Sequence, residues 1–207
     1  MEVVIEHLKR DQPLVPVLET TPLRMPRLND DVYLQLLKAI VEQQLSTKAA
    51  ATIWGRFRQL FDDYPHPEVV LDHDVEVFRG AGLSYQKAGY IQNIARFAQK
   101  DGLSKTHIDS LSDQEALNHL TQIKGVGRWT AEMILMFSLG RPDVFPVDDL
   151  IIRNAMIRVY DVTSEKRQLY RDLEAIAERW SPYRSYACFI LWDYYEGQVM
   201  GRELYGG

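Results

Sequence analysis

Cysteine is almost absent from this chain of 207 residues, because Cys188 is the only one. A single thiol excludes an intramolecular disulfide, a zinc site of four thiolates and a cysteine-ligated iron–sulfur cluster. No apolar run is long enough to cross a bilayer, and the first residues, MEVVIEHLKRD, are acidic and mixed, unlike a secretory signal. We therefore expect a protein of a reducing cytoplasm that has no membrane partner.

An excess of positive charge is also missing. The formal net charge is -5, which argues mildly against a nucleic-acid partner, since such proteins usually carry a basic face. The charge is unevenly distributed, however, and basic residues gather in the second half of the chain, at Lys124, Arg128, Arg141, Arg153 and Arg158. A local basic rim on an acidic protein therefore stays compatible with the sequence.

Sustained alternation of Val, Ile and aromatic residues, the pattern of β-strands, is not found either. Apolar residues recur at helical spacing instead, and the turns between the segments are short. The sequence predicts an all-α fold of about ten helices in a single domain over residues 1–207. Besides a short N-terminal helix, the expected helices cover 31–45, 47–61, 67–71, 75–78, 85–99, 114–122, 130–139, 150–159, 166–179 and 183–195.

The stretch from residue 121 to 149, TQIKGVGRWTAEMILMFSLGRPDVFPVDD, contains the most informative pattern. A glycine hairpin, Gly125-Val126-Gly127, precedes an apolar helical run, and two carboxylates, Asp148 and Asp149, precede the next. Glycine permits sharp turns and close approach of a ligand, and the exposed N–H groups of a helix N-terminus bind anions. The pattern predicts a phosphate site and a carboxylate separated by one helix.

Several blocks in this order resemble one family. IKGVGRWTAEMILMF…DVFPVDDLIIRNAM, AIVEQQLSTKAAATI, GLSYQKAGYIQNIA and RWSPYRSYACFILWDYY are similar to the helix-hairpin-helix DNA glycosylases, in the 3-methyladenine DNA glycosylase II branch for alkylation repair. The resemblance implies a compact form without the extra N-terminal lobe of larger members. It also implies a helix-hairpin-helix at about 114–139 and two helical lobes with a cleft between them.

The implied activity is hydrolysis of the N-glycosidic bond of alkylated purines, such as 3-methyladenine and 7-methylguanine, in duplex DNA. The enzyme flips the damaged base and leaves an abasic site, the first step of base excision repair. We expect a monomer in a bacterial cytoplasm or nucleoid, or in a nucleus. Two alternatives remain: a glycosylase of the same fold for deaminated or oxidised bases, and a non-catalytic DNA-binding helix-hairpin-helix protein.

The hairpin is the candidate DNA-binding element. Backbone N–H groups around Gly125, Gly127 and Thr130 would hold a DNA phosphate, with Lys124 and Arg128 beside them. The resemblance further implies a monovalent cation, Na⁺ or K⁺, on the backbone carbonyls of Thr121, Ile123 and Val126, and no cofactor for catalysis. The plainer interpretation is a helix–turn–helix corner, which glycines form equally well.

Asp149 is the candidate catalytic residue. Cleavage of an N-glycosidic bond builds positive charge on the deoxyribose, which a nearby carboxylate stabilises. The family pattern favours the second aspartate of the pair, and Asp148 is then expected to cap the helix or to support Asp149. Either residue alone is also explained as a helix N-cap.

Aromatic residues are the candidate base pocket. Lyase members of the superfamily have a nucleophilic lysine where this chain has Trp129, so the resemblance implies hydrolysis without strand cleavage. Trp129 and Trp192 would stack on the flipped base, although packing in the core is the ordinary role of such residues. Met133 and Asp193 replace aromatic residues of the best-known bacterial members, which leaves the range of bases open.

Gln43 and Gln44 lie in a predicted corner between two helices. A flipped nucleotide leaves a gap in the duplex, and the resemblance places the residue that fills it at Gln44. Both glutamines are equally well explained as ordinary polar residues at a helix end.

Overall fold

The computed structural model describes residues 1–100 and 102–199, and all regular structure in these ranges is helical. The all-α prediction is thus confirmed. None of the helices in the described ranges combines the length and the apolar composition needed to cross a membrane. The α-helices are α1 (Glu2–Leu8), α2 (Val15–Thr20), α3 (Val32–Glu42), α4 (Thr47–Gln59), α5 (Pro67–Asp72), α6 (Val75–Gly80), α7 (Tyr85–Lys100), α8 (Lys105–Asp109), α9 (Asp113–Thr121), α10 (Arg128–Met133), α11 (Leu150–Tyr160), α12 (Lys166–Ala177) and α13 (Arg184–Asp193).

The chain divides into two compact units, in agreement with the two helical lobes expected from the sequence. One unit covers residues 28–139, and the other combines residues 1–27 with the chain from residue 140 onward. The single domain over 1–207 and its cleft stay predictions.

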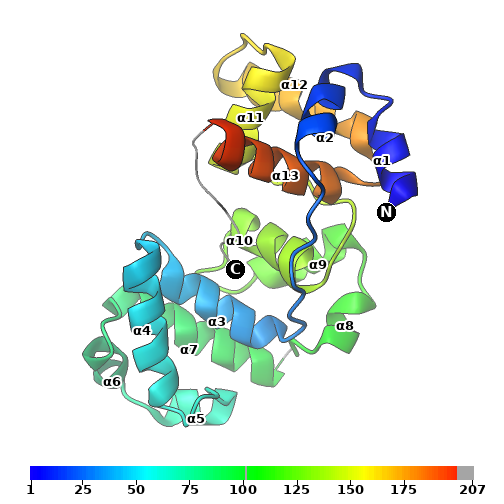
Figure 1. Ribbon diagram of the computed structural model, residues 1–207. Helices are drawn as coiled ribbons and strands as arrows, with labels where there is room; N and C mark the ends of the chain where they lie inside the picture. The colour runs from blue at the N-terminus through cyan, green and yellow to red at the C-terminus, as the bar shows by residue number, and fades with distance from the viewer. Residues whose placement is uncertain (101, 200–207) are drawn as a thin grey trace. The chain divides into compact units, whose positions relative to one another are not determined.

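The unit of residues 28–139 is built around α7. Helices α3 and α5 pack against α7, and α4 packs against α3 (Figure 1). The buried face of α3 presents Leu36, Leu37 and Ile40, and that of α7 presents Ile91 and Ile94. This spacing of three and four residues is the apolar periodicity visible in the sequence. Helices α9 and α10, which flank the hairpin, pack against one another in the same unit.

The other unit is organised around α13, which is buried on most of its surface. Helices α11 and α2 pack against α13 (Figure 1). A buried polar cluster joins the N-terminal segment to this core, because Asp11 accepts hydrogen bonds from Tyr160 Oη (2.7 Å) and from Trp180 Nε1 (2.8 Å). The first 27 residues are therefore part of this unit although more than 100 residues separate them from it in sequence.

The structure departs from the predicted helices in two ways. The described ranges contain thirteen α-helices rather than about ten, since α2 and α8 span only six and five residues, too few for a visible apolar period. The helix expected at 130–139 is α10 followed by a π-helix, Ile134–Ser138, in which the Leu139 N–H donates to the Ile134 carbonyl (3.2 Å). A second π-helix, Tyr194–Val199, extends α13. Wide turns of this kind do not change the apolar pattern enough to be predicted.

Candidate functional site

The glycine hairpin joins α9 to α10. Gly125 has φ +111°, a conformation that side chains rarely adopt, and a Cβ there would lie 2.3 Å from the Tyr90 ring. Gly127, the N-cap residue of α10, has φ -84°, and a Cβ there would meet nothing within 4 Å. Only Gly125 is therefore required by the fold, and Gly127 keeps open space next to the start of α10.

The hairpin is anchored to its own unit through its central residues. The Val126 N–H donates to the Ile123 carbonyl (2.9 Å), and both side chains are buried. Asn93 Nδ2 on α7 donates to the Lys124 carbonyl (3.1 Å). The N–H groups of Gly125 and Gly127, in contrast, meet no acceptor within the described ranges. The hairpin thus presents two backbone donors beside a helix N-terminus, as an anion site requires.

The other residues predicted to bind DNA at the hairpin differ in their exposure and in their hydrogen-bond partners. Lys124 is exposed. Arg128 Nε donates to Glu132 Oε1 (2.8 Å), and the Glu132 side chain is only 2% exposed. This buried carboxylate therefore neutralises part of the positive charge of Arg128. Thr130 is buried as a whole residue, and its backbone N–H lies in the first turn of α10.

The hairpin carbonyls fit the donor chemistry of a monovalent cation. The carbonyls of Thr121 and Val126 accept no hydrogen bond among the described residues, and the Ile123 carbonyl accepts only one. Carbonyl oxygens near the C-terminal end of α9 carry partial negative charge, which favours a hard cation. Within residues 1–100 and 102–199, no group of His, Cys, Asp and Glu is placed to hold a metal.

Trp129 is not a core residue. Its side chain is 42% exposed, although it lies in the first turn of α10 beside a strongly apolar helix. Met133 follows four residues later on the same face of α10 and is half-buried. An exposed indole beside an exposed backbone donor is unusual in a core-forming segment, so packing in the core does not explain Trp129.

The predicted corner at Gln43 and Gln44 is confirmed between α3 and α4. Gln43 ends α3 with φ -49° and ψ 131°, and Gln44 has φ +58°, the left-handed region that favours glycine. Gln44 is exposed, as is Ser46, the N-cap of α4. An exposed non-glycine residue in a strained conformation is a feature of functional loops.

Asp149 is the N-cap of α11. Its Oδ1 accepts the N–H groups of Ile151 (3.0 Å) and Ile152 (2.9 Å), and its side chain is buried, with 6% exposed. Of the two roles expected of Asp148, that of helix cap is therefore wrong, and support of Asp149 stays a prediction. Asp148 is exposed, and its carbonyl accepts from Arg153 Nη1 (2.7 Å). A turn at Pro146 precedes the helix, because the Asp149 N–H donates to the Pro146 carbonyl (2.9 Å). Asp149 leaves this turn at the start of α11, where its carboxylate caps the helix.

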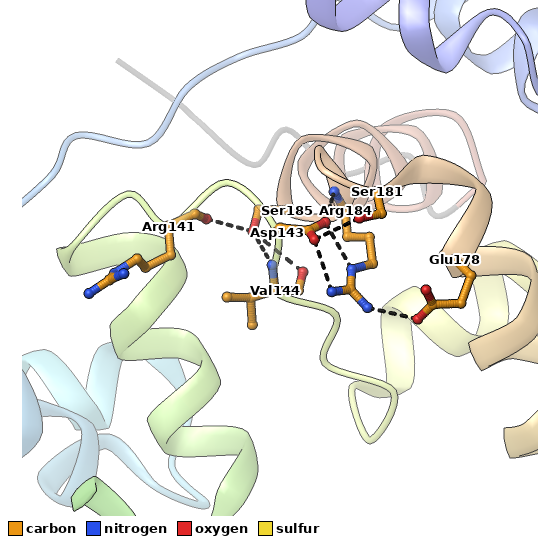
Figure 2. Close-up of polar contacts among 7 residues, drawn as sticks. All are labelled: Arg141, Asp143, Val144, Glu178, Ser181, Arg184 and Ser185. Atoms are coloured by element: carbon orange, nitrogen blue, oxygen red, sulfur yellow. Dashed lines mark hydrogen bonds and ion pairs between the residues drawn. The ribbon is translucent and has the colours of Figure 1, made fainter. Parts of the chain in front are cut away.

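The segment before Asp149 is fixed to the start of α13 by a polar network (Figure 2). Arg184 forms a two-pronged ion pair with Asp143, with Nε–Oδ1 at 2.8 Å and Nη2–Oδ2 at 3.0 Å, and Ser181 Oγ donates to the same carboxylate (2.9 Å). Partial burial opposes ionisation of Asp143, but the hydrogen bonds from Arg184 and Ser181 outweigh it and hold the pKa of Asp143 below its usual value. Figure 2 also shows Ser185 Oγ donating to the Arg141 carbonyl (2.7 Å) and accepting from the Val144 N–H (2.9 Å).

This network was only partly visible in the sequence. Asp143 and Arg184 lie 41 residues apart in the chain, so no local pattern connects them. The only local signal is the position of Asp143 directly after Pro142, in a segment that must be held in an irregular conformation. The network explains how a loop without regular structure presents Asp149 reproducibly.

Trp192 and Asp193 lie at the end of α13, and both are half-buried. Asp193 Oδ1 is buried and has no hydrogen-bond partner within the described ranges. Desolvation raises the pKa of Asp193, although the positive charge of Arg24 opposes the shift. A half-buried carboxyl group with one oxygen that lacks a hydrogen bond is a candidate ligand-binding position.

The predicted residues fall into two groups. The hairpin, Trp129, Met133 and the Gln43-Gln44 corner belong to the unit of residues 28–139, whereas the two aspartates, Trp192 and Asp193 belong to the other unit. Within the first unit, one helix, α7, contacts both the hairpin and the corner. Within the second, α11 and α13 pack together and so hold Asp149 and Trp192 on neighbouring helices.

Comparison with known proteins adds independent information. The family described as HhH-GPD superfamily base excision DNA repair protein matches residues 37–182. DNA-3-methyladenine glycosylase 1 of Schizosaccharomyces pombe is 39% identical over 164 residues, which cover 77% of this chain and 71% of that protein. DNA-3-methyladenine glycosylase 2 of Escherichia coli is 30% identical over 185 residues, covering 84% and 61%.

Solved structures agree with these relatives. A DNA-3-methyladenine glycosidase from Bacillus halodurans matches with a TM-score of 0.84 and 32% identity, over 94% of this chain and 89% of that one. The 3-methyladenine DNA glycosylase of Schizosaccharomyces pombe, in complex with abasic DNA, matches with a TM-score of 0.81 and 32% identity, over 93% and 96%. The likeness therefore extends over nearly the whole chain.

Proposed function

This chain belongs to the HhH-GPD superfamily of base excision DNA repair proteins, and from that premise we propose that it is a monofunctional DNA glycosylase for alkylated purines. It hydrolyses the N-glycosidic bond of bases such as 3-methyladenine and 7-methylguanine in duplex DNA and leaves an abasic site. The observation that carries the proposal is Asp149, a buried carboxylate fixed at a helix N-terminus in a chain whose relatives are named as 3-methyladenine glycosylases.

Asp149 supplies the electrostatic part of catalysis in this proposal. The leaving base is already cationic when alkylated, so a single carboxylate that stabilises the positive sugar and directs water is sufficient. The backbone bonds from Ile151 and Ile152 hold the carboxylate in one orientation before substrate arrives, and the Asp143–Arg184 network holds the preceding loop. Such preorganisation is what makes an electrostatic group effective in a transition state.

The hairpin supplies binding in this proposal. The free N–H groups of Gly125 and Gly127 hold one phosphate through backbone dipoles, so a chain with a net charge of -5 does not need a large basic face. Lys124 adds one exposed charge nearby. A Na⁺ or K⁺ ion on the carbonyls of Thr121, Ile123 and Val126 would strengthen the positive potential of the hairpin.

Aromatic stacking supplies base recognition. Trp129 is exposed, and Trp192 precedes Asp193, whose Oδ1 has no hydrogen-bond partner within the described ranges. A cationic methylated purine is attracted to the face of an indole and to a carboxylate, whereas a neutral normal base gains much less from either. Trp129 has no nucleophile, so the mechanism is hydrolysis and does not break the strand.

Product analysis with a panel of lesions tests the proposal. Wild-type protein is incubated with duplexes that contain one 7-methylguanine, 3-methyladenine, hypoxanthine, uracil or 8-oxoguanine, and free base, abasic sites and strand breaks are measured separately. We expect free methylpurine and abasic sites without breaks. Release confined to deaminated or oxidised bases would replace the alkylated substrate with that class, and lesion-independent binding without release would identify a non-catalytic DNA-binding protein.

The oligomeric state and the compartment complete the proposal. We propose that the protein acts as a monomer in the compartment that contains the DNA, which is the bacterial cytoplasm or nucleoid, or the nucleus. Light scattering in solution, with and without duplex DNA, tests the first part.

A further inference from the structure

Lys87, in the first turn of α7, has its ammonium group bound to the corner between α3 and α4. Its Nζ donates to the Val41 carbonyl (2.8 Å) and to the Gln43 carbonyl (2.6 Å). These carbonyls belong to the last turn of α3 and its C-cap, where backbone acceptors have no partner inside the helix. A cation at a helix C-terminus also complements the partial negative charge there.

The corner needs this support because its own hydrogen bonds are few. Within the described ranges, the Gln43 N–H donates to the Ala39 carbonyl (3.1 Å) and the Leu45 N–H donates to the Glu42 carbonyl (3.2 Å). Gln44 itself lies in a left-handed conformation at φ +58°. A residue without glycine's freedom adopts that conformation only where its surroundings enforce it.

Lys87 is not a free surface lysine. Lys87 is half-buried, and this burial lowers the pKa of its ammonium group. Its carbonyl partners lie 46 and 44 residues earlier in the chain, so the contact is tertiary. The positive charge is therefore committed to the protein backbone and is a poor candidate for a DNA phosphate contact.

The same face of α7 also seats the hairpin. Tyr90 packs against Gly125, and Asn93 binds the Lys124 carbonyl, so residues 87, 90 and 93 follow one another at three-residue spacing. One helix thereby sets the separation between the hairpin, which the proposed function places on DNA, and the corner, where the family resemblance places the residue that fills the gap in the duplex.

We propose that Lys87 is a positioning residue that holds the Gln43-Gln44 corner so that Gln44 enters the gap left by the flipped nucleotide. This inference rests on the proposed function. Lys87 does not touch the reacting atoms, and its effect passes through Gln44. Loss of the ammonium group leaves two carbonyls without a donor and lets the corner relax, which lowers the fraction of molecules that present Gln44 correctly.

A mutant cycle between Lys87 and Gln44 tests the inference. Single-turnover release of 7-methylguanine from a duplex is measured for wild type, Lys87→Met, Gln44→Ala and the double variant, with Lys87→Arg as rescue. Lys48→Met, an exposed lysine in the first turn of α4, serves as the control for loss of one surface charge near the corner. Urea unfolding of each variant separates lost rate from lost fold.

We expect Lys87→Met and Gln44→Ala each to slow release by about tenfold, and the double variant to be no slower than the slower single variant. Lys87→Arg recovers most of the rate because a guanidinium also donates to two carbonyls. Effects of the two substitutions that multiply, an unchanged rate in Lys87→Met, or a loss in Lys48→Met as large as in Lys87→Met would overturn the inference. If wild type releases no base, the proposed function is wrong, and the inference is tested by binding instead. The fluorescence of 2-aminopurine placed opposite an abasic analogue then reports insertion of Gln44 into the bound duplex. Equal changes of this signal in Lys87→Met and Gln44→Ala support the inference, and an unchanged signal in Lys87→Met overturns it.

Discussion

Asp149 is both a helix cap and the proposed catalytic group, and one pair of substitutions separates these roles. Asp149→Asn keeps an oxygen at the Oδ1 position, where both hydrogen bonds from Ile151 and Ile152 are accepted, and removes the negative charge. Asp149→Ala removes the oxygen as well. If the residue only caps α11, activity follows stability, whereas a catalytic carboxylate makes the two measurements diverge.

The stability effects follow from the geometry. Asparagine caps helices about as well as aspartate, and loss of the charge next to the helix N-terminus costs about 0.3–1 kcal/mol. Alanine loses the cap, which costs about 0.5–2 kcal/mol, and leaves the buried Ile152 N–H without an acceptor, so the total reaches about 2 kcal/mol. The alanine variant should therefore unfold at clearly lower urea concentration than the asparagine variant.

The loss of activity, unlike the loss of stability, should be similar in the two variants. Removal of a charge-stabilising group typically costs about 10²–10³ in rate, so Asp149→Asn should lose nearly as much activity as Asp149→Ala while staying folded. Single-turnover release of 7-methylguanine from methylated duplex DNA measures the rate, and urea denaturation measures stability. Asp148→Asn is the matched control, since that side chain is exposed at the adjacent position.

Two results would refute this reasoning. Asp149→Asn with a rate within about threefold of wild type would make Asp149 a cap and nothing more. Equal losses in Asp148→Asn and Asp149→Asn would show that the charge of the pair, rather than the buried carboxylate, is what matters.

The remaining predictions concern the hairpin, a helix cap and one carboxyl group. Gly125→Ala should lower stability, because its Cβ would lie 2.3 Å from the Tyr90 ring at φ +111°, whereas Gly127→Ala, with nothing within 4 Å, should keep wild-type stability and weaken duplex binding in a fluorescence anisotropy titration. Ser112→Ala removes the capping box of α9 and should cost about 1 kcal/mol in urea unfolding without changing the rate of base release; a fall in rate at full stability would contradict it. The pKa of Asp193 is raised by desolvation, so its contribution to stability is present below its unfolded value, near pH 4, and is lost as pH rises through the folded value. Asp193→Asn should therefore be stabilising relative to wild type at pH 7 but not at pH 3.5, and an equal change in the urea midpoint at both pH values would exclude this cause.

Much of the fold could be predicted from the sequence, because helices depend on residues that are close together in the chain. The apolar residues of α3 and α7 recur every three or four positions, and such spacing leaves only a helix with one buried face. The hairpin was readable for a similar reason, since glycine at residue 125 permits a conformation that few residues adopt. The family resemblance followed from these local blocks and is confirmed by the match over residues 37–182.

Local patterns did not assign every role correctly. Either aspartate of the pair was a suitable cap for α11, and the expectation that Asp148 takes this role was wrong because the turn at Pro146 determines which carboxylate faces the first N–H groups. Whether Trp129 is buried was likewise undecided, since its neighbours in α10 are apolar and only packing shows which face of the helix is covered.

Sequence alone determined the helical class, because that feature follows from residue type and short-range spacing, and it indicated the family and the candidate catalytic pair through the resemblance of several local blocks. Only the tertiary structure showed that Asp149 caps α11, that Arg184 pairs with Asp143, and that Lys87 holds the corner before Gln44. The last two contacts join residues more than 40 positions apart, and such pairs exist only after helices have packed and brought distant backbone acceptors and charges together.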